Sequence, residues 1–309
     1  MKNKSENQLP DKKREDDFDR QYDHPAVVRI GKEKLEIYDT KPEQPKTEVP
    51  VVFAPGWMPS PKMSKDVVRA IFDKGRRTLS FYAPHGVETD VIKSKEAARD
   101  VAYAELRKVE ALLKTLDEKG IEKTDAAGHS EGGMYLAYAA LFFPEKFRNI
   151  VLVDPVGIVG EDNMVRLGLG ALEDIRTQGK KQKKGLEAGE KKLEPDWKYV
   201  LDFLKTGPGL MFREVHAMAN ADITWILAEL KKKGIGISII HGGDDKYFPM
   251  ERVQQMVKTN QIDGFYSVKG GHMEIITRAG RYAGLVEQAF TDLENKREGK
   301  SAYAASAGK

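Results

Sequence analysis

Residues 124–141 read Thr-Asp-Ala-Ala-Gly-His-Ser-Glu-Gly-Gly-Met-Tyr-Leu-Ala-Tyr-Ala-Ala-Leu, the pattern of a short strand, a tight turn and an apolar helix. Within this stretch, Gly128, Ser130 and Gly132 form a Gly-x-Ser-x-Gly motif. The motif is typical of a nucleophile elbow, where a serine on a strained turn exposes its hydroxyl. Side chains at the flanking positions would crowd that turn, and the first amides of the following helix favour negative charge. The motif alone also fits a plain glycine turn, so its meaning depends on the rest of the chain.

Strands and helices alternate on both sides of this motif. Nearly continuous apolar runs, of the kind that buried parallel strands show, are separated by amphipathic stretches of ten or more residues. This alternation predicts an α/β protein with a mostly parallel central sheet and helices on both faces. The strands are expected near residues 27–30 and 34–38 (a hairpin), 48–54, 78–82, 124–127, 150–153, 237–240 and 265–268. Helices are expected over residues 67–74, 95–119, 134–143 and 280–294.

The stretch from 156 to 224 interrupts the alternation and carries apolar residues in helix-like patterns. We expect it to be an inserted helical cap over the sheet, with a lysine-rich link at residues 179–185 and an apolar wall toward the site. The remaining boundaries follow: a disordered tail at 1–24, a core at 25–155 and 225–295, and a flexible tail at 296–309. The apolar residues of the insertion are Met164, Leu167, Leu169, Leu172, Trp197, Phe203, Leu204, Met211, Phe212 and Met218.

Composition narrows the classes of protein. The chain of 309 residues has a net charge of only +3, its charges are mixed, and it contains no cysteine. Nucleic acid is therefore not an expected partner, and disulfides, a cysteine nucleophile and thiolate metal sites are excluded. The N-terminus lacks the apolar core of a signal peptide, and the longest apolar run is too short to span a bilayer. We expect a cytoplasmic protein without a membrane span, and the sequence leaves the oligomeric state open.

A serine nucleophile needs a base that takes its proton and an acid that orients the base. Among six histidines, His272 is the preferred base because it follows a strand in the sequence Lys-Gly-Gly-His-Met-Glu at 269–274. Two glycines before it would let its backbone approach another loop closely. The acid is expected after the preceding strand, where Asp244 and Asp245 are adjacent.

The elbow and these two loops together resemble the α/β-hydrolase family. The resemblance covers roughly residues 25–155 and 225–294, and the elbow is similar to that of the family's lipases and esterases. The order serine, aspartate, histidine along the chain is also the family's order. In the family's acid loop, Gly-x-x-Asp-x-x-x-Pro, the match places Gly242, Asp245 and Pro249. The resemblance thus implies Asp245 as the acid, with Asp154, which follows an earlier strand, as a rival beside Asp244.

The resemblance also implies an oxyanion hole made of two backbone N–H groups. One is the amide of Glu131, the residue after the serine. The other is the amide of Trp57, in the Pro-Gly-Trp turn at 55–57 where the family often has His-Gly. The side chain of Glu131 could face the substrate, favour the helix N-terminus or contact the cap.

Other signals are weak. A His-Met-Glu triplet at 272–274 lacks the cysteines of a zinc deaminase, and a Gly-Leu-Gly triplet at 168–170 lacks the third glycine of a dinucleotide fingerprint. No metal or organic cofactor is expected. The leading hypothesis is a serine hydrolase that cleaves an ester of a small, largely apolar molecule through an acyl-enzyme. Alternatives are a carbon–carbon bond hydrolase, a peptidase, or a non-catalytic binding protein of the same fold.

Overall fold

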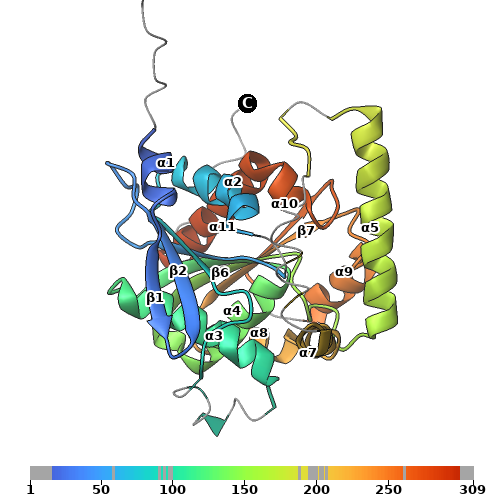
Figure 1. Ribbon diagram of the computed structural model, residues 1–309, viewed down its shortest axis with the longest axis horizontal. Coiled ribbons are helices and arrows are strands. Elements are labelled where there is room, and N and C mark those ends of the chain that lie inside the picture. Colours follow the sequence, from blue (N-terminus) through green and yellow to red (C-terminus); the bar gives the residue numbers. More distant parts are fainter. Residues whose placement is uncertain are drawn as a thin grey trace, which may run out of the picture.

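A computed structural model of the chain gives an open, eight-stranded sheet with helices on both faces (Figure 1). The strand order is β1-β2-β4-β3-β5-β6-β7-β8, and β2 alone runs antiparallel to both of its neighbours. The predicted α/β class and its mostly parallel sheet are therefore confirmed. The described residues are 16–57, 60–89, 92, 95–96, 100–186, 189–193, 201, 205, 208–259 and 262–299.

Each strand lies where the sequence predicts it, with ends that differ by a few residues. The first two form a hairpin, and the six that follow are parallel to one another. The carboxyl ends of parallel strands share one edge of the sheet, so the loops that follow them gather there. The strands are β1 Ala26–Ile30, β2 Glu33–Thr40, β3 Val51–Ala54, β4 Thr78–Tyr82, β5 Thr124–His129, β6 Phe147–Val153, β7 Gly236–Gly242 and β8 Gly264–Val268.

The two faces of the sheet carry separate layers of helices. In Figure 1, α2 (Pro61–Phe72), α10 (Glu274–Thr277) and α11 (Ala279–Arg297) lie on one side, and α3 (Tyr103–Glu118), α4 (Glu131–Phe142) and α8 (Thr224–Lys232) lie on the other. Strand residues alternate between the two resulting apolar clusters. In β6, for example, Ile150 and Leu152 pack toward α4, while Val151 and Val153 pack toward α11. This alternation reflects the two-residue period of a strand that is buried on both faces.

The expectation of a disordered tail over residues 1–24 is wrong for part of it. Asp17–Tyr22 form helix α1, which is capped by the Asp16 side chain. Phe18 and Tyr22 are one helical turn apart and are both buried, so the short helix is held by packing against α2 and β2. Residues 1–15 lie outside the described part of the chain.

Other helix boundaries also differ from the prediction, among them the start of α2 at Pro61 rather than at residue 67. Helix α3 begins at Tyr103, well after residue 95, because Ala102 has an extended backbone that cannot continue a helix. At the other end of the chain, α11 runs to Arg297, past the expected start of a tail at 296. The Arg297 guanidinium donates 2.7 Å to the carbonyl of Arg148 and so holds the last helical turn against β6.

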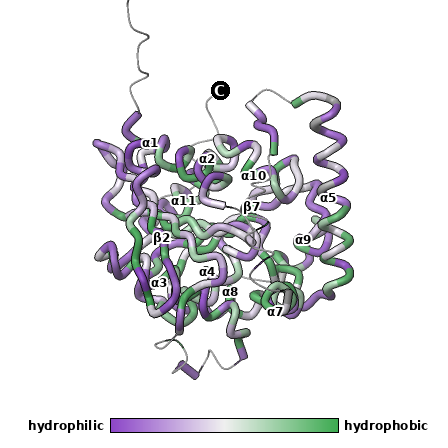
Figure 2. The backbone as a smooth tube through the Cα atoms, viewed as in Figure 1, coloured by the Kyte–Doolittle hydropathy of each residue, from purple (hydrophilic) through white to green (hydrophobic). Residues whose placement is uncertain are grey.

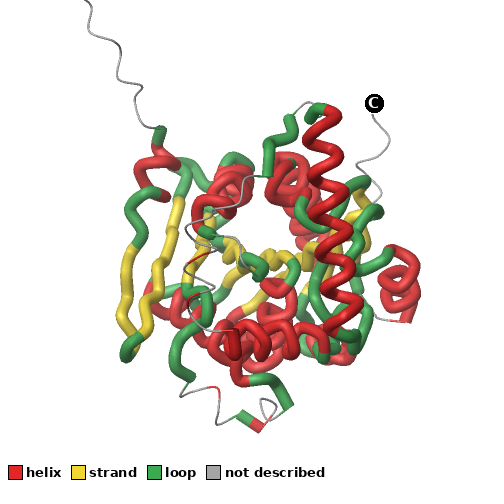
Figure 3. Tube along the Cα trace, turned by 45° about the vertical axis from the view of Figure 1, so that its right-hand side comes forward, coloured by secondary structure: helices red, strands yellow, loops and turns green. Residues whose placement is uncertain are grey.

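The insertion between β6 and β7 contains α5 (Met164–Lys184) and α7 (Pro208–Ala219) before α8. Figures 1 and 3 show α5 as a long helix along one side of the molecule. Figure 2 shows hydrophobic residues in its N-terminal half and a hydrophilic C-terminal end. The predicted lysine-rich link is in fact the last part of α5 up to residue 184, because lysine and glutamine are good helix formers. Of the expected apolar residues, Trp197, Phe203 and Leu204 lie outside the described residues.

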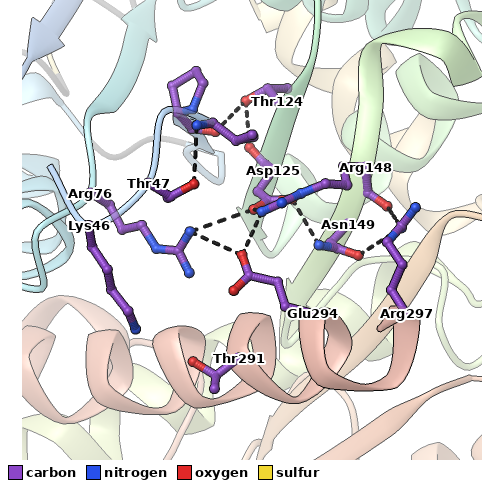
Figure 4. Close-up of polar contacts among 12 residues, drawn as sticks. Lys46, Thr47, Arg76, Thr124, Asp125, Arg148, Asn149, Thr291, Glu294 and Arg297 are labelled. Carbon is purple, nitrogen blue, oxygen red and sulfur yellow. Dashed lines mark hydrogen bonds and ion pairs between the residues drawn. The ribbon is translucent and has the colours of Figure 1, made fainter. Parts of the chain in front are cut away.

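A buried cluster of charged side chains links α11 to one edge of the sheet (Figure 4). This edge is opposite to the one where the loops that follow the parallel strands gather. Asp125, at the start of β5, is fully buried and forms a salt bridge with Arg148. It also lies 3.8 Å from Arg76, whose guanidinium is 3.3 Å from the Glu294 carboxylate of α11. Asn149 donates a further hydrogen bond of 3.0 Å to Asp125. These partners offset part of the cost of burying the Asp125 carboxylate, and the cluster links α11 to the sheet.

No helix within the described part of the chain is long and apolar enough to cross a membrane.

Candidate active site

The predicted site residues meet at the carboxyl edge of the sheet. Ser130 follows β5, Asp245 follows β7, and His272 follows β8. The Pro-Gly-Trp turn at 55–57 follows β3, which is hydrogen-bonded to β5. Four loops far apart in sequence therefore converge because their strands are parallel neighbours or near neighbours in one sheet.

Ser130 has the strained backbone that the elbow motif predicts. Its φ is 55° and its ψ is −122°, outside the regions that non-glycine residues prefer. Its amide donates 2.9 Å to the carbonyl of Val153, which holds the turn against β6. Both motif glycines are needed for space: a Cβ at Gly132 would lie 2.1 Å from the carbonyl oxygen of Ala54, and one at Gly128 would lie 2.7 Å from that of Gly132. The elbow, its helix and the end of β3 can pack this closely only with glycine at these positions.

Ser130, His272 and Asp245 form a continuous hydrogen-bonded relay. The Nε2 atom of His272 lies 2.9 Å from Oγ of Ser130, and its Nδ1 lies 2.9 Å from a carboxylate oxygen of Asp245. Because a carboxylate only accepts, Nδ1 carries the hydrogen and Nε2 is left to accept the serine proton. This arrangement is the one that a general base beside a serine nucleophile requires.

The second carboxylate oxygen of Asp245 is also occupied. It accepts hydrogen bonds from the amides of Tyr247, at 2.7 Å, and Phe248, at 3.0 Å. Burial opposes ionisation, but the facing His272, the nearby His241 and the Phe248 amide keep the pKa of Asp245 below its ordinary value. The Tyr247 and Phe248 rings also pack on the His272 ring, with centroids 4.4 and 5.6 Å away. The sequence argument did not identify these supporting residues, although they lie within the acid loop.

The pKa of His272 is shifted upward. Burial alone would favour the neutral ring, but the charge and hydrogen bond of Asp245 outweigh it, with Asp154 and Asp174 adding to the effect. A raised pKa means that the imidazolium formed after proton transfer is stabilised. The ring is therefore a stronger base than a free histidine.

The rival acids occupy other positions. Asp154 accepts 2.8 Å from the amide of Gly242, and the same oxygen lies 2.8 Å from Nδ1 of His241. The other ring nitrogen of His241 donates 2.8 Å to the carbonyl of Phe248. Asp154 and His241 thus brace the two ends of the acid loop, whereas Asp245 is the carboxylate hydrogen-bonded to His272. The Asp244 amide donates to the carbonyl of Gly270, which joins the acid loop to the loop that carries His272.

The two residues expected to supply the oxyanion amides both lie near the serine, Glu131 next to it in sequence and Trp57 in the wall of the same cavity. Glu131 is the first residue of α4, so its N–H has no acceptor within the helix. On the opposite side, a Cβ at Gly56 would be 3.1 Å from Cβ of Ser130, which shows how closely the turn before Trp57 approaches the elbow. The hydroxyl of Tyr135 donates 2.7 Å to the carbonyl of Pro55 and steadies that turn. The Glu131 side chain pairs with Lys108 of α3.

His129 has a role that the sequence argument missed. Its ring is buried, and its Nε2 donates 3.0 Å to the backbone carbonyl of His272. Burial, together with the nearby His272, lowers the pKa of His129 to about 3, so this ring stays neutral. His129 is also one of the residues that line the cavity beside the serine.

An apolar cavity of about 210 Å³ opens above Ser130 and His272. Its wall combines Trp57 with residues from the start of α5, from α7 and from the acid loop. No lysine, arginine or carboxylate lines it within the described residues. The apolar lining residues are Trp57, Val156, Met164, Leu167, Ala171, Val215, Met218, Tyr247, Phe248 and Met273.

Two overlapping groups of side chains could in principle ligate a metal. One is His129, Asp154 and His272, and the other is Asp154, His241 and Asp245, each with ligand atoms within 4.8 Å of one another. Hydrogen bonds already engage Nδ1 and Nε2 of His272 and Nε2 of His129 and His241. Within the described part of the chain, these hydrogen bonds explain where the four ring nitrogens lie.

Comparison with known proteins starts from sequence. No family model matches the chain. A relative from Mycobacterium phage D29, named "Putative non-heme haloperoxidase", is 26% identical over 269 residues, which cover 81% of this chain and 91% of the relative.

Solved structures give the clearer comparison. A serine hydrolase from Cycloclasticus zankles superposes with a TM-score of 0.60 at 14% identity, covering 87% of this chain and 98% of that one. A carboxylesterase structure from Nitrososphaera gargenis gives 0.60 at 15% identity, with 88% and 100% covered. The bromoperoxidase of Bacillus anthracis gives 0.58 at 18% identity, with 87% and 100% covered. Together with the sheet topology and the elbow, these likenesses show that the chain has the α/β-hydrolase fold.

Proposed function

We propose that the protein is a serine hydrolase that cleaves esters of small, largely apolar carboxylic acids through an acyl-enzyme. The observation that carries the proposal is the relay from Ser130 through His272 to Asp245 at the floor of an apolar cavity. A serine–histidine–carboxylate relay with a purely structural role would need neither a strained serine backbone nor an opening onto a cavity.

The reaction follows from the hydrogen positions. Oγ of Ser130 attacks the ester carbonyl while Nε2 of His272 takes its proton, and the imidazolium then passes that proton to the leaving alcohol. Water, deprotonated by the same nitrogen, attacks the acyl-enzyme and releases the acid. Asp245 holds the ring tautomer, and the amides of Trp57 and Glu131 are proposed to stabilise the oxyanion in both steps.

The cavity supports the proposed substrate class. Its lining is apolar and includes three methionines, which adapt to differently shaped groups. A charged acyl group would lose its hydration there without gaining a partner. We propose that residues 156–224 act as the cap, because α5 and α7 supply Met164, Leu167, Val215 and Met218 to this wall.

The central test is labelling of Ser130 by a fluorophosphonate probe. The parent protein should be labelled at one site, and Ser130→Ala should lose the label together with roughly three or more decades of ester turnover while remaining folded. Equal labelling of the parent and the Ala variant would refute the assignment. Efficient cleavage of an anilide or a diketone beside trace ester hydrolysis would instead favour the peptidase or carbon–carbon alternative.

The names of the phage relative and of the Bacillus anthracis structure favour one second activity. Hydrogen peroxide could replace water as the nucleophile toward the acyl-enzyme, which would yield a peroxyacid and free Ser130. That peroxyacid could then oxidise bromide in solution. Adding acetate, peroxide and bromide to the parent and to Ser130→Ala tests this route, and bromination that persists in the variant would exclude it.

A further inference from the structure

A buried cluster of polar side chains lies behind the wall of the apolar cavity. It consists of Trp57, His85, Lys108, Glu131 and Glu214, called here the Glu214 cluster. These residues come from five segments: the turn after β3, the loop after β4, α3, the first turn of α4, and α7 of the insertion. The cluster therefore joins both proposed oxyanion segments to the insertion.

Glu214 is the centre of this cluster. One of its carboxylate oxygens accepts 3.0 Å from the indole Nε1 of Trp57. The other lies 3.1 Å from Nδ1 of His85 and 3.3 Å from Nζ of Lys108. Lys108 in turn pairs with Glu131, the residue that follows the proposed nucleophile. The Glu214 side chain is only 1% exposed, so its interactions are almost entirely with protein groups.

The chemistry of the cluster makes these contacts interdependent. A buried carboxylate without donors is strongly unfavourable, whereas one with several donors can remain charged. Burial opposes ionisation of Glu214, but His85, Lys108 and Trp57 lower its pKa below the ordinary value. Helix α7 can therefore occupy its observed place at low cost only while Trp57 and His85 face Glu214.

The hydrogen bond to Trp57 has a direct consequence for the site. Trp57 lines the cavity, and its backbone amide is the proposed oxyanion donor. Fixing the ring restricts the backbone to which it is attached, in a turn that already lies against Ser130. The neighbour of Glu214 in α7, Val215, lines the same cavity. One carboxylate thus connects the wall that meets the acyl group to the turn that would meet the oxyanion.

We propose that Glu214 is a positioning residue that holds the Trp57 turn in the geometry needed for oxyanion stabilisation and makes that geometry depend on the seating of α7. The inference rests on the proposed function, because it assigns Trp57 a role in the same reaction. It predicts that losing this hydrogen bond lowers turnover more than it weakens substrate binding, since the oxyanion exists only after attack.

The test compares Glu214→Ala, Trp57→Phe and the double variant, using p-nitrophenyl butyrate hydrolysis and the rate of fluorophosphonate labelling. Each single variant should lower kcat about 10- to 100-fold, less than the complete loss of an oxyanion donor, with a change in KM below about threefold. The double variant should be no slower than the slower single variant, because both changes remove the same hydrogen bond. Glu214→Gln, which keeps an acceptor for Nε1, should recover part of the lost kcat.

The control is Glu229→Gln, at a half-exposed position of α8 paired with Lys232, which should leave kcat and KM unchanged. If Glu214→Ala fails to fold, Trp57→Phe tests the same bond with the carboxylate still in place. The proposal is overturned if both single variants raise KM and leave kcat intact, or if their effects on kcat multiply in the double variant. Failure of the parent to be labelled at Ser130 would instead overturn the proposed function itself, so the two failures are distinguishable.

Discussion

The Nε2–H of His129 donates a hydrogen bond of 3.0 Å to the backbone carbonyl of His272. The residue before the proposed nucleophile thus holds the residue proposed as its base. One strand end, that of β5, therefore sets the position of Ser130 and braces the backbone of its partner. With a pKa of about 3, His129 remains neutral wherever His272 titrates, so this brace does not change over the working pH range.

The pH dependence of ester hydrolysis should report His272. The ring acts as a base only when neutral, and its pKa is raised above 6.5 by Asp245. We expect kcat/KM to rise with pH through an apparent pKa above 6.5 and then level off. Asp245→Asn should move this limb to lower pH, because the imidazolium loses its stabilising charge. A limb that stays in place in that variant would contradict the assignment.

Replacing each aspartate by asparagine should separate the three candidate acids. Asp245→Asn should lower kcat by about three to four decades, because Asn permits the wrong imidazole tautomer. Asp154→Asn should cost less than about tenfold, since Asp154 contacts Gly242 and His241. Asp244→Asn should be close to the parent. Steady-state kinetics with one ester decide the question, and a collapse confined to Asp154→Asn would transfer the role.

Gly132→Ala should disable the elbow. The added Cβ would meet the Ala54 carbonyl oxygen at 2.1 Å, so the end of β3 or the elbow must move. We expect a destabilisation of about 1–3 kcal/mol or more, together with a large loss of kcat. Gly284→Ala is the matched control, because it lies within α11 with no atom within 4 Å of the new Cβ. It should be neutral or stabilising by up to about 1 kcal/mol in thermal unfolding.

Substrate preference should follow the apolar cavity. Each methylene that fits should improve kcat/KM by up to about fourfold, from about 0.8 kcal/mol of burial, until the cavity is full. Val215→Phe, which narrows the α7 side of the wall, should shift the optimum to shorter acyl chains. A series of p-nitrophenyl esters measures both effects. If the preferred chain length does not change, Val215 does not limit the space for the acyl group.

Asp174 of α5 should make the protein less stable above about pH 6 than at acidic pH. Burial raises its pKa from 3.8 to about 6, so the folded protein favours the protonated form. Its stabilising contribution is complete below pH 3.8 and is lost as the pH rises through 6. Asp174→Asn, which resembles the protonated acid, should therefore raise Tm by a few degrees at pH 8 and hardly at all at pH 4. An equal gain at both values would contradict this account.

Motifs with strict spacing were predictable from the sequence. The elbow at Ser130 needs its glycines, and strands of a parallel sheet bring the loops of Asp245 and His272 to it. The sequence around Glu214 contains no motif of this kind, because a single glutamate in an amphipathic helix usually faces water. Its burial depends on Trp57 and Lys108, which are distant in sequence and become neighbours only in the fold.

Two helical segments are not predictable from the composition of their stretches. Phe18 and Tyr22 lie in a charged segment of low average hydrophobicity, which concealed one amphipathic turn. The lysines within residues 180–184 give that stretch the composition of a link, although their propensity for helix is high. In both cases tertiary packing or residue propensity outweighed the composition of the segment.

The bonds that assemble the site join residues very far apart along the chain. Ser130 and His272 are separated by 142 positions, His129 and His272 by 143, and Trp57 and Glu214 by 157. Such contacts close large loops and form late when a chain folds. During refolding from denaturant, helical circular dichroism should therefore recover before reactivity toward a fluorophosphonate. Ser130 would not react with the fluorophosphonate until the last strand, β8, has joined the sheet.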